Sequence, residues 1–203
     1  MTLDILYVMA VEQEYGPQLR ARITPLMLGV GPVEAAVGMT AELAGLKSVG
    51  RLPHLVVSLG SAGSARLAQG RVYQASSVSW RDMDASALGF EKGVTPFLGL
   101  PAVLSLGHAV PGLPLASLST GGDIVSGKRY AQIEADMVDM ETYAVLRACQ
   151  RFGVPLVALR GISDGDEALQ TLSDWTQYLH VVDANLATAV DLLEASVKDG
   201  RVP

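Results

Sequence analysis

Acidic or hydroxyl side chains occur at five points where an apolar run of the chain gives way to a polar or glycine-rich stretch. These five residues are Glu14, Ser61, Asp123, Glu141 and Asp164. Carboxyl groups can give or take protons in a reaction, and a neighbouring hydroxyl can orient them. Serine, aspartate and glycine are also common in turns and helix caps. Any one of the five is therefore better explained by local structure, and only their shared position after predicted strands indicates a site.

The elements that must position these residues follow from the hydrophobic pattern. Short apolar runs predict strands over 3–10, 23–30, 54–59, 71–80, 115–120, 137–140 and 154–162. Helical composition predicts helices over 33–46, 126–135, 141–152 and 172–195, and the segment 12–22 is compatible with a helix. The predicted apolar face of the first helix carries Val33, Ala36, Val37, Thr40 and Leu43. Residues 85–113, rich in glycine and proline, show no clear pattern. Alternating strands and helices predict an α/β sandwich, which binds ligands beyond the carboxyl ends of its strands.

Length and composition predict a single domain over residues 1–203 with a large buried core. The chain has 203 residues, of which 49% are hydrophobic and 18% charged, so it is not a disordered protein. The net charge of −6 argues against a nucleic-acid partner. The first four residues lack the basic region of a signal peptide, and the apolar stretch 5–11 is too short to span a bilayer. We therefore expect a cytoplasmic protein with no membrane partner.

Cysteine and histidine are too sparse for a disulfide or a metal site. The single cysteine, Cys149, excludes an internal disulfide, and its place in an amphipathic helix indicates an inert core residue. The histidines, His54, His108 and His180, have no partner at metal-ligand spacing. We expect no metal.

Three glycine-containing motifs suggest other chemistry. The run 29–31 begins like a dinucleotide-binding fingerprint, but Glu34 occupies the place of the third glycine. The sequence GISDG at 161–165 has the spacing of a hydrolase nucleophile elbow, yet only His180 follows it, within a predicted helix. The glycine-rich segment 60–64 could hold a phosphate, a sugar hydroxyl or a water. The first two motifs are rejected, and the third stays open.

Several stretches, in their order along the chain, resemble the purine nucleoside phosphorylase and hydrolase superfamily, most of all the 5′-methylthioadenosine/S-adenosylhomocysteine nucleosidases. The stretches are MAVEQE at 9–14, GVGPVEAA at 29–36, LGSAG at 59–63, VDMET at 138–142 and the segment 154–164 ending in RGISD, with a weaker sixth from 80 to 90. The resemblance runs from about residue 5 to Asp166. It implies a three-layer αβα sandwich around a central mixed, twisted sheet.

The implied activity is hydrolysis of the N-glycosidic bond of an adenine nucleoside, which frees adenine and a ribose derivative. The resemblance implies no cofactor, a nucleoside substrate, a place in nucleoside metabolism and methionine salvage, and a homodimer that completes each pocket across its interface. Asp164 corresponds to the general acid that protonates the departing base, and Ser163 would orient this aspartate or touch the base. Glu14 corresponds to the carboxylate that positions and deprotonates the attacking water, with Glu12 as the neighbouring alternative.

The remaining implied contacts surround the water and the sugar. Ser61 and Gly63 would help to hold the water, and Glu141 would accept hydrogen bonds from the ribose hydroxyls. The backbone of Met140 would lie beside the sugar, and Arg160 would compensate the clustered carboxylates, which otherwise raise one another's pKa.

The sequence departs from the family pattern at three places. Val125 stands where relatives carry the phenylalanine that stacks on the base, Arg81 replaces a histidine, and the chain is short between residues 88 and 115. The 5′-substituent is therefore open, and a futalosine-type or lipid-linked adenine nucleoside is an alternative substrate. A phosphate-dependent phosphorylase is a second alternative, disfavoured because Glu12 and Glu14 would face the phosphate. A catalytically weak nucleoside-binding homologue is the third.

Overall fold

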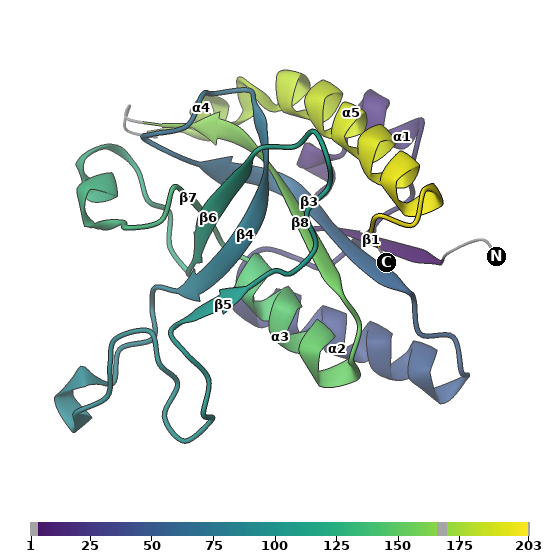
Figure 1. Cartoon of the computed structure of the whole chain (residues 1–203). Helices are drawn as coiled ribbons and strands as arrows, with labels where there is room; N and C mark the ends of the chain where they lie inside the picture. Colours follow the sequence, from purple (N-terminus) through teal and green to yellow (C-terminus); the bar gives the residue numbers. More distant parts are fainter. Residues whose placement is uncertain (1–3, 166–169, 203) are drawn as a thin grey trace.

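The computed structural model describes residues 4–165 and 170–202 (Figure 1). Leu3, where the first predicted strand begins, and Asp166, where the family resemblance ends, lie outside these residues. The described strands are β1 (Ile5–Met9), β2 (Leu26–Met27), β3 (Leu55–Gly63), β4 (Val72–Trp80), β5 (Val103–Ser105), β6 (Leu115–Thr120), β7 (Met137–Asp139) and β8 (Leu156–Asp164). The α-helices are α1 (Pro17–Arg20), α2 (Pro32–Ser48), α3 (Thr142–Phe152), α4 (Leu172–Thr176) and α5 (Leu179–Lys198). Short 3-10 turns are η1 (Glu12–Glu14), η2 (Ser86–Leu88) and η3 (Gly127–Gln132).

The strands form one mixed sheet that closes on itself. Their order is β2-β1-β3-β7-β6-β4-β5, and β8 pairs with both β3 and β4. The pairing of β8 with β3 is parallel and that with β4 is antiparallel. Register shifts interrupt β3 at Ala62/Gly63 and β4 at Ala75/Ser77, and such bulges bend a strand toward a new neighbour. The predicted mixed central sheet is confirmed, whereas the predicted three-layer sandwich is not, because β3, β7, β6, β4 and β8 close a barrel-like circuit.

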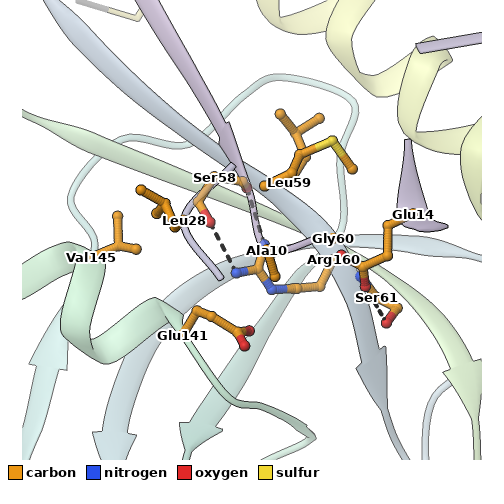
Figure 2. Close-up of a pocket in the computed structure, with 11 residues that line it drawn as sticks. Ala10, Glu14, Leu28, Ser58, Leu59, Gly60, Ser61, Glu141, Val145 and Arg160 are labelled. Atoms are coloured by element: carbon orange, nitrogen blue, oxygen red, sulfur yellow. Dashed lines mark hydrogen bonds between the residues drawn. The ribbon is translucent and has the colours of Figure 1, made fainter. Parts of the chain in front are cut away.

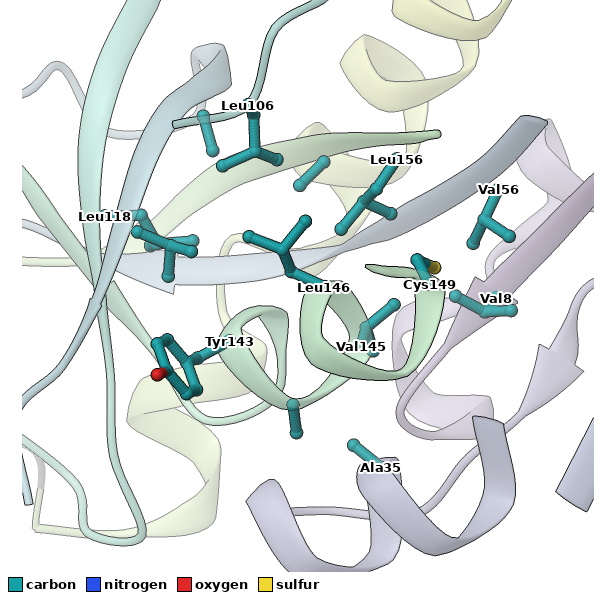
Figure 3. Packing of buried hydrophobic residues seen from close by; sticks show 14 of the residues in the cluster. Val8, Ala35, Val56, Leu106, Leu118, Tyr143, Val145, Leu146, Cys149 and Leu156 are labelled. Carbon is teal, nitrogen blue, oxygen red and sulfur yellow. The ribbon is translucent and has the colours of Figure 1, made fainter. Parts of the chain in front are cut away.

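Apolar cores lie on both sides of the sheet. Helices α2 and α3 cover one side, and α1 and α5 cover the other (Figure 1). Figure 3 shows the first core, in which Val145, Leu146 and Cys149 of α3 face the strands. Burial raises the pKa of the Cys149 thiol to about 12, so this cysteine is the inert core residue that the sequence predicts. No helix among the described residues combines the length and hydrophobicity needed to cross a bilayer.

The buried face of α2 differs from the predicted one. The side chains of Ala35, Met39 and Leu43, one turn apart, are buried, whereas Val33 is 69% exposed and Val37 is 62% exposed. Of the predicted face, Leu43 is buried and Ala36 half-buried, whereas the prediction is wrong for Val33, Val37 and Thr40, which are exposed. The hydrophobic pattern is apolar nearly all round this helix, so the helices and strands packed against it decide which stripe is buried.

Other predicted boundaries differ from the observed ones, because strand pairing over long sequence distances or a tight turn defines the element. The segment 60–64 was predicted to be a glycine-rich loop, but its residues 60–63 form the end of β3, where Ser61 pairs with Gly161 and Gly63 with Val138. The predicted helix 126–135 is only the turn η3, segment 12–22 divides into η1 and α1, and 172–195 divides into α4 and α5. By contrast, β6 and α3 match their predictions closely, and Gly153 ends α3 with a positive φ of 70°.

Candidate active site

Glu14 is held over the middle of β3 by the turn η1. Its side chain is buried, and Oε1 accepts hydrogen bonds from the Ser61 backbone N–H at 2.8 Å and from the Ser61 hydroxyl at 2.6 Å (Figure 2). A Cβ on Gly60 would lie 3.0 Å from Oε2, so the glycine gives this carboxyl group room. Burial raises the pKa of Glu14, although the Ser61 bonds and Arg160 oppose the rise. The carboxylate is therefore suited to take a proton. Its predicted alternative, Glu12, lies at the surface, 2.7 Å from Arg20.

Asp164 ends β8 beside the last residue of β3. Its Oδ1 accepts a hydrogen bond from the Ser163 hydroxyl at 2.7 Å, and Oδ2 accepts one from the Tyr130 hydroxyl at 3.1 Å. A Cβ on Gly63 would lie 2.7 Å from Oδ2, so only glycine leaves room for this carboxyl group. Burial raises the pKa of Asp164, and the two hydroxyl donors lower it less. A raised pKa is what a proton donor near neutral pH requires.

A buried ion pair joins Asp139, the last residue of β7, to Arg160 in the middle of β8. The Arg160 guanidinium bonds Asp139 through Nε at 3.1 Å and Nη2 at 3.0 Å. Its other bonds reach the Ser58 carbonyl and hydroxyl, the Leu159 carbonyl and the Thr142 hydroxyl. These acceptors use all five guanidinium N–H groups. Asp139, which lies in the motif VDMET at 138–142 and had no predicted role, is the direct partner of Arg160.

Glu141 precedes α3 and faces the same group of charges. Its Oε1 accepts a hydrogen bond from the Gly31 backbone N–H at 2.8 Å. Burial, and secondarily the nearby Asp139 carboxylate, raises the pKa of Glu141 to about 7. Gly31 has a φ of 93°, a conformation that favours glycine and that directs its N–H to this carboxylate.

One cavity of about 810 Å³ brings most of the predicted site residues together. Its volume lies in the range of small-molecule sites, about 300–1,000 Å³. Eight of the residues singled out in the sequence line it: Glu14, Ser61, Gly63, Asp123, Val125, Met140, Glu141 and Asp164. Ser163 is not among its lining residues, so it can orient Asp164 but does not face the cavity. Arg160 instead lines a separate space of about 10 Å³ with Glu14 and Glu141, large enough for about one water (Figure 2).

Trp175 and Arg81 are polar wall residues to which the sequence assigned no place in the site. Trp175 of α4 lines the cavity, and its Nε1–H donates to Ser61 Oγ at 3.1 Å. Nothing in the predicted helix 172–195 signalled this contact. Arg81, noted only as a replacement for histidine, also lines the cavity and donates to the Ser119 carbonyl at 2.7 Å and the Asp139 carbonyl at 2.9 Å. It fixes the ends of the neighbouring strands. Within 4–165 and 170–202, no cluster of three His, Cys, Asp or Glu side chains could hold a metal ion.

Comparisons with known proteins identify relatives of this chain. A family model described as the phosphorylase superfamily matches residues 124–198. The 5′-methylthioadenosine/S-adenosylhomocysteine nucleosidase of Actinobacillus succinogenes is 33% identical over 162 residues, which cover 70% of this chain and 67% of that protein. The nucleosidase of the same name from Haemophilus influenzae strain PittEE is 34% identical over 166 residues, covering 73% of this chain and 70% of that protein.

Solved structures share the fold at lower identity. The native futalosine hydrolase of Helicobacter pylori strain 26695 has a TM-score of 0.79 and 20% identity, covering 97% of this chain and 99% of that one. The Neisseria meningitidis 5′-methylthioadenosine/S-adenosylhomocysteine nucleosidase in complex with methylthio-immucillin-A has a TM-score of 0.76 and 20% identity, covering 95% and 98%. At these identities the structural matches establish the fold alone.

Proposed function

The chain belongs to the family of 5′-methylthioadenosine/S-adenosylhomocysteine nucleosidases, and from this membership we propose that it hydrolyses the N-glycosidic bond of an adenine nucleoside. The products are free adenine and a 5-substituted ribose. One observation carries the proposal: two buried carboxyl groups with raised pKa, Glu14 and Asp164, line one cavity and each occupies the space beside a glycine of β3.

The two carboxyl groups divide the proton transfers. As the bond between the sugar and the base breaks, positive charge builds on the ribose and negative charge on the base. The protonated Asp164 gives its proton to an imidazole-ring nitrogen of adenine, so the base departs neutral. Glu14 takes a proton from a water, whose oxygen forms the new bond to the sugar carbon. The cycle ends with Glu14 protonated and Asp164 ionised, and exchange of protons with solvent restores both groups.

The sugar and the base meet the remaining predicted residues. Glu141 uses one oxygen for the Gly31 N–H and has its second oxygen for the ribose hydroxyls. Met140 lies on the cavity wall beside it. Val125, buried and on the same cavity, supplies an apolar surface for the base without the stacking of an aromatic ring. Ser163 keeps its role as the residue that orients Asp164.

Water is a better nucleophile for this site than phosphate. The guanidinium of Arg160 is fully occupied by protein acceptors, so it has no N–H group to offer a phosphate. The space beside Glu14 and Arg160, about 10 Å³, has room for about one water. Among the described residues that line the large cavity, Arg81 is the cation, and it donates to backbone carbonyls and lies 3.5 Å from Asp123. A phosphate site normally offers several free cationic donors.

The test is release of free base from methylthioadenosine, adenosylhomocysteine, a futalosine-type nucleoside and inosine, in buffers with and without phosphate. Adenine release without phosphate supports the hydrolase. Turnover that requires phosphate would assign the chain to the phosphorylases. If the protein binds nucleosides tightly but releases no base, and Asp164→Asn behaves in the same way, the chain is a nucleoside-binding homologue without catalytic activity.

The proposal includes a homodimer of one-domain subunits. Val33 and Val37, one turn apart on α2, expose apolar side chains. Val30, which precedes α2 and lines the cavity, is 53% exposed. A second subunit packed on this face would cover them. Light scattering that finds only monomers at the concentration of the activity assay would contradict this part of the proposal.

A further inference from the structure

We infer that Trp175 is a positioning residue, which directs the Ser61 hydroxyl toward Glu14 from the wall of the cavity. The inference rests on the proposed function, because it assigns Glu14 the task of activating water. Trp175 lies on the short helix α4, which the sequence did not predict to be part of the site.

The directions of the hydrogen bonds carry the inference. An indole N–H can only donate, and the Nε1–H of Trp175 donates to Ser61 Oγ at 3.1 Å. A serine hydroxyl has one proton, and that of Ser61 goes to Glu14 Oε1 at 2.6 Å. The hydroxyl that accepts from the indole is thereby kept as a donor to the carboxylate. Within the described residues, the hydrogen bonds from the Ser61 backbone and hydroxyl both reach Oε1, so Oε2 is the oxygen available to a water.

The contact depends on the indole N–H group as a hydrogen-bond donor, and not only on the apolar surface of the ring. A phenylalanine at this position could form the same apolar wall, but it could not donate to Ser61. The start of α4 is fixed by a capping box in which Thr171 and Asp174 bond each other's backbone, so the helix presents Trp175 in a defined direction. Leu172, on the same helix and the same cavity, is 72% exposed and provides a matched comparison without a polar group.

Other charges around Glu14 stay in place when the indole changes. Arg160 on β8 lowers the pKa of Glu14, and Asp139 at the end of β7 raises it. Glu141 precedes α3 and interacts electrostatically with Glu14. On α5, Asp183 bonds two backbone N–H groups at the start of α1. The indole N–H donates to Ser61 and not to any of these groups, so a change in Glu14 titration on substitution of Trp175 would pass through Ser61.

The first test is spectroscopic and does not require activity. The chain has two tryptophans, so ¹⁵N-labelled protein gives two indole N–H resonances, and Trp175→Phe identifies the relevant one. We expect this resonance to shift as pH is varied through the titration of Glu14, and the shift to vanish in Ser61→Ala and in Glu14→Gln. A resonance that does not respond to pH, or responds equally in Ser61→Ala, would overturn the inference.

The second test is kinetic and uses a double-mutant cycle. Trp175→Phe is expected to lower kcat by about 2- to 13-fold, the range of one neutral hydrogen bond. It should also move the acidic limb of the rate profile to higher pH, because a less well oriented Ser61 stabilises the Glu14 carboxylate less. In a Ser61→Ala background the same substitution should cause no further movement of that limb. Additive effects in the cycle would show that the indole only packs against the cavity.

The matched variant Leu172→Ala separates wall contacts from positioning. It should change KM for nucleosides with a 5′-substituent and leave the acidic limb where it is. An active wild-type protein whose pH profile is unchanged by Trp175→Phe would refute the inference and leave the proposed function intact. A wild-type protein that releases no base would refute the proposed function, and the indole titration would still decide whether Trp175 and Glu14 are linked.

Discussion

Replacing Gly63 by alanine should disable the candidate proton donor without changing any titratable group. The added Cβ would lie 2.7 Å from Asp164 Oδ2 and closer still to the Tyr130 hydroxyl. Ordinary van der Waals contact begins at 3.4 Å, so the difference between 3.4 and 2.7 Å requires the carboxylate oxygen to move by about 0.7 Å. The Tyr130 hydroxyl, which donates to that oxygen, must move as well.

The expected loss of rate follows from this displacement. Misplacing a reacting group by about 1 Å can cost on the order of 100-fold, so we expect kcat to fall by about 10- to 100-fold. Overpacking at a buried position also destabilises a protein by about 1–3 kcal/mol. The assay must therefore separate a displaced carboxyl group from an unfolded protein.

The assay measures initial rates of adenine release at saturating substrate. At temperatures well below Tm the variant is folded, so a lower rate reports a displaced carboxyl group and not unfolding. Gly107→Ala is the control, because a Cβ there meets no atom within 4 Å and the residue does not line the cavity. Its kcat should equal that of the wild type. Full kcat in a folded Gly63→Ala variant would refute the assignment of Asp164 as the proton donor.

Four further substitutions test the site and its support. Asp164→Asn and Glu14→Gln each remove one proton transfer and should lower kcat by about 10²–10⁴-fold, with little change in nucleoside affinity measured by calorimetry; full activity in either variant would contradict the role of that residue. The pKa of Glu141 is about 7 in the folded protein against an ordinary value of 4.5, so between these pH values the folded state keeps a proton that the unfolded state loses. The free energy of unfolding attributable to Glu141 therefore falls as pH rises through this window, and Glu141→Gln should flatten the fall in urea titrations at pH 5, 6 and 7.5. Asp183→Asn weakens the acceptor for two backbone N–H groups of α1 and should lower the free energy of unfolding by about 1–3 kcal/mol, with kcat unchanged below Tm.

The sequence by itself determined the local elements and the family. The strand 115–120 and the helix ending at Gly153 were predicted with nearly correct boundaries, because a short apolar run, a helical period and a glycine cap are properties of adjacent residues. The order of short motifs identified the family and named Glu14, Glu141 and Asp164. These three residues line one cavity in the structure, as motifs at the carboxyl ends of strands predict.

Only the tertiary structure decided which side chains meet. Ser61 and Trp175 are 114 positions apart, and no local pattern connects them. The glycine-rich segment 60–63 becomes a strand because β7 and β8 pair with it, and its glycines then make room for two carboxyl groups. The buried stripe of α2 was mispredicted for the same reason. A hydrophobic period gives the type of an element, whereas the face that is buried and the partner of each polar group depend on elements that are distant in the chain.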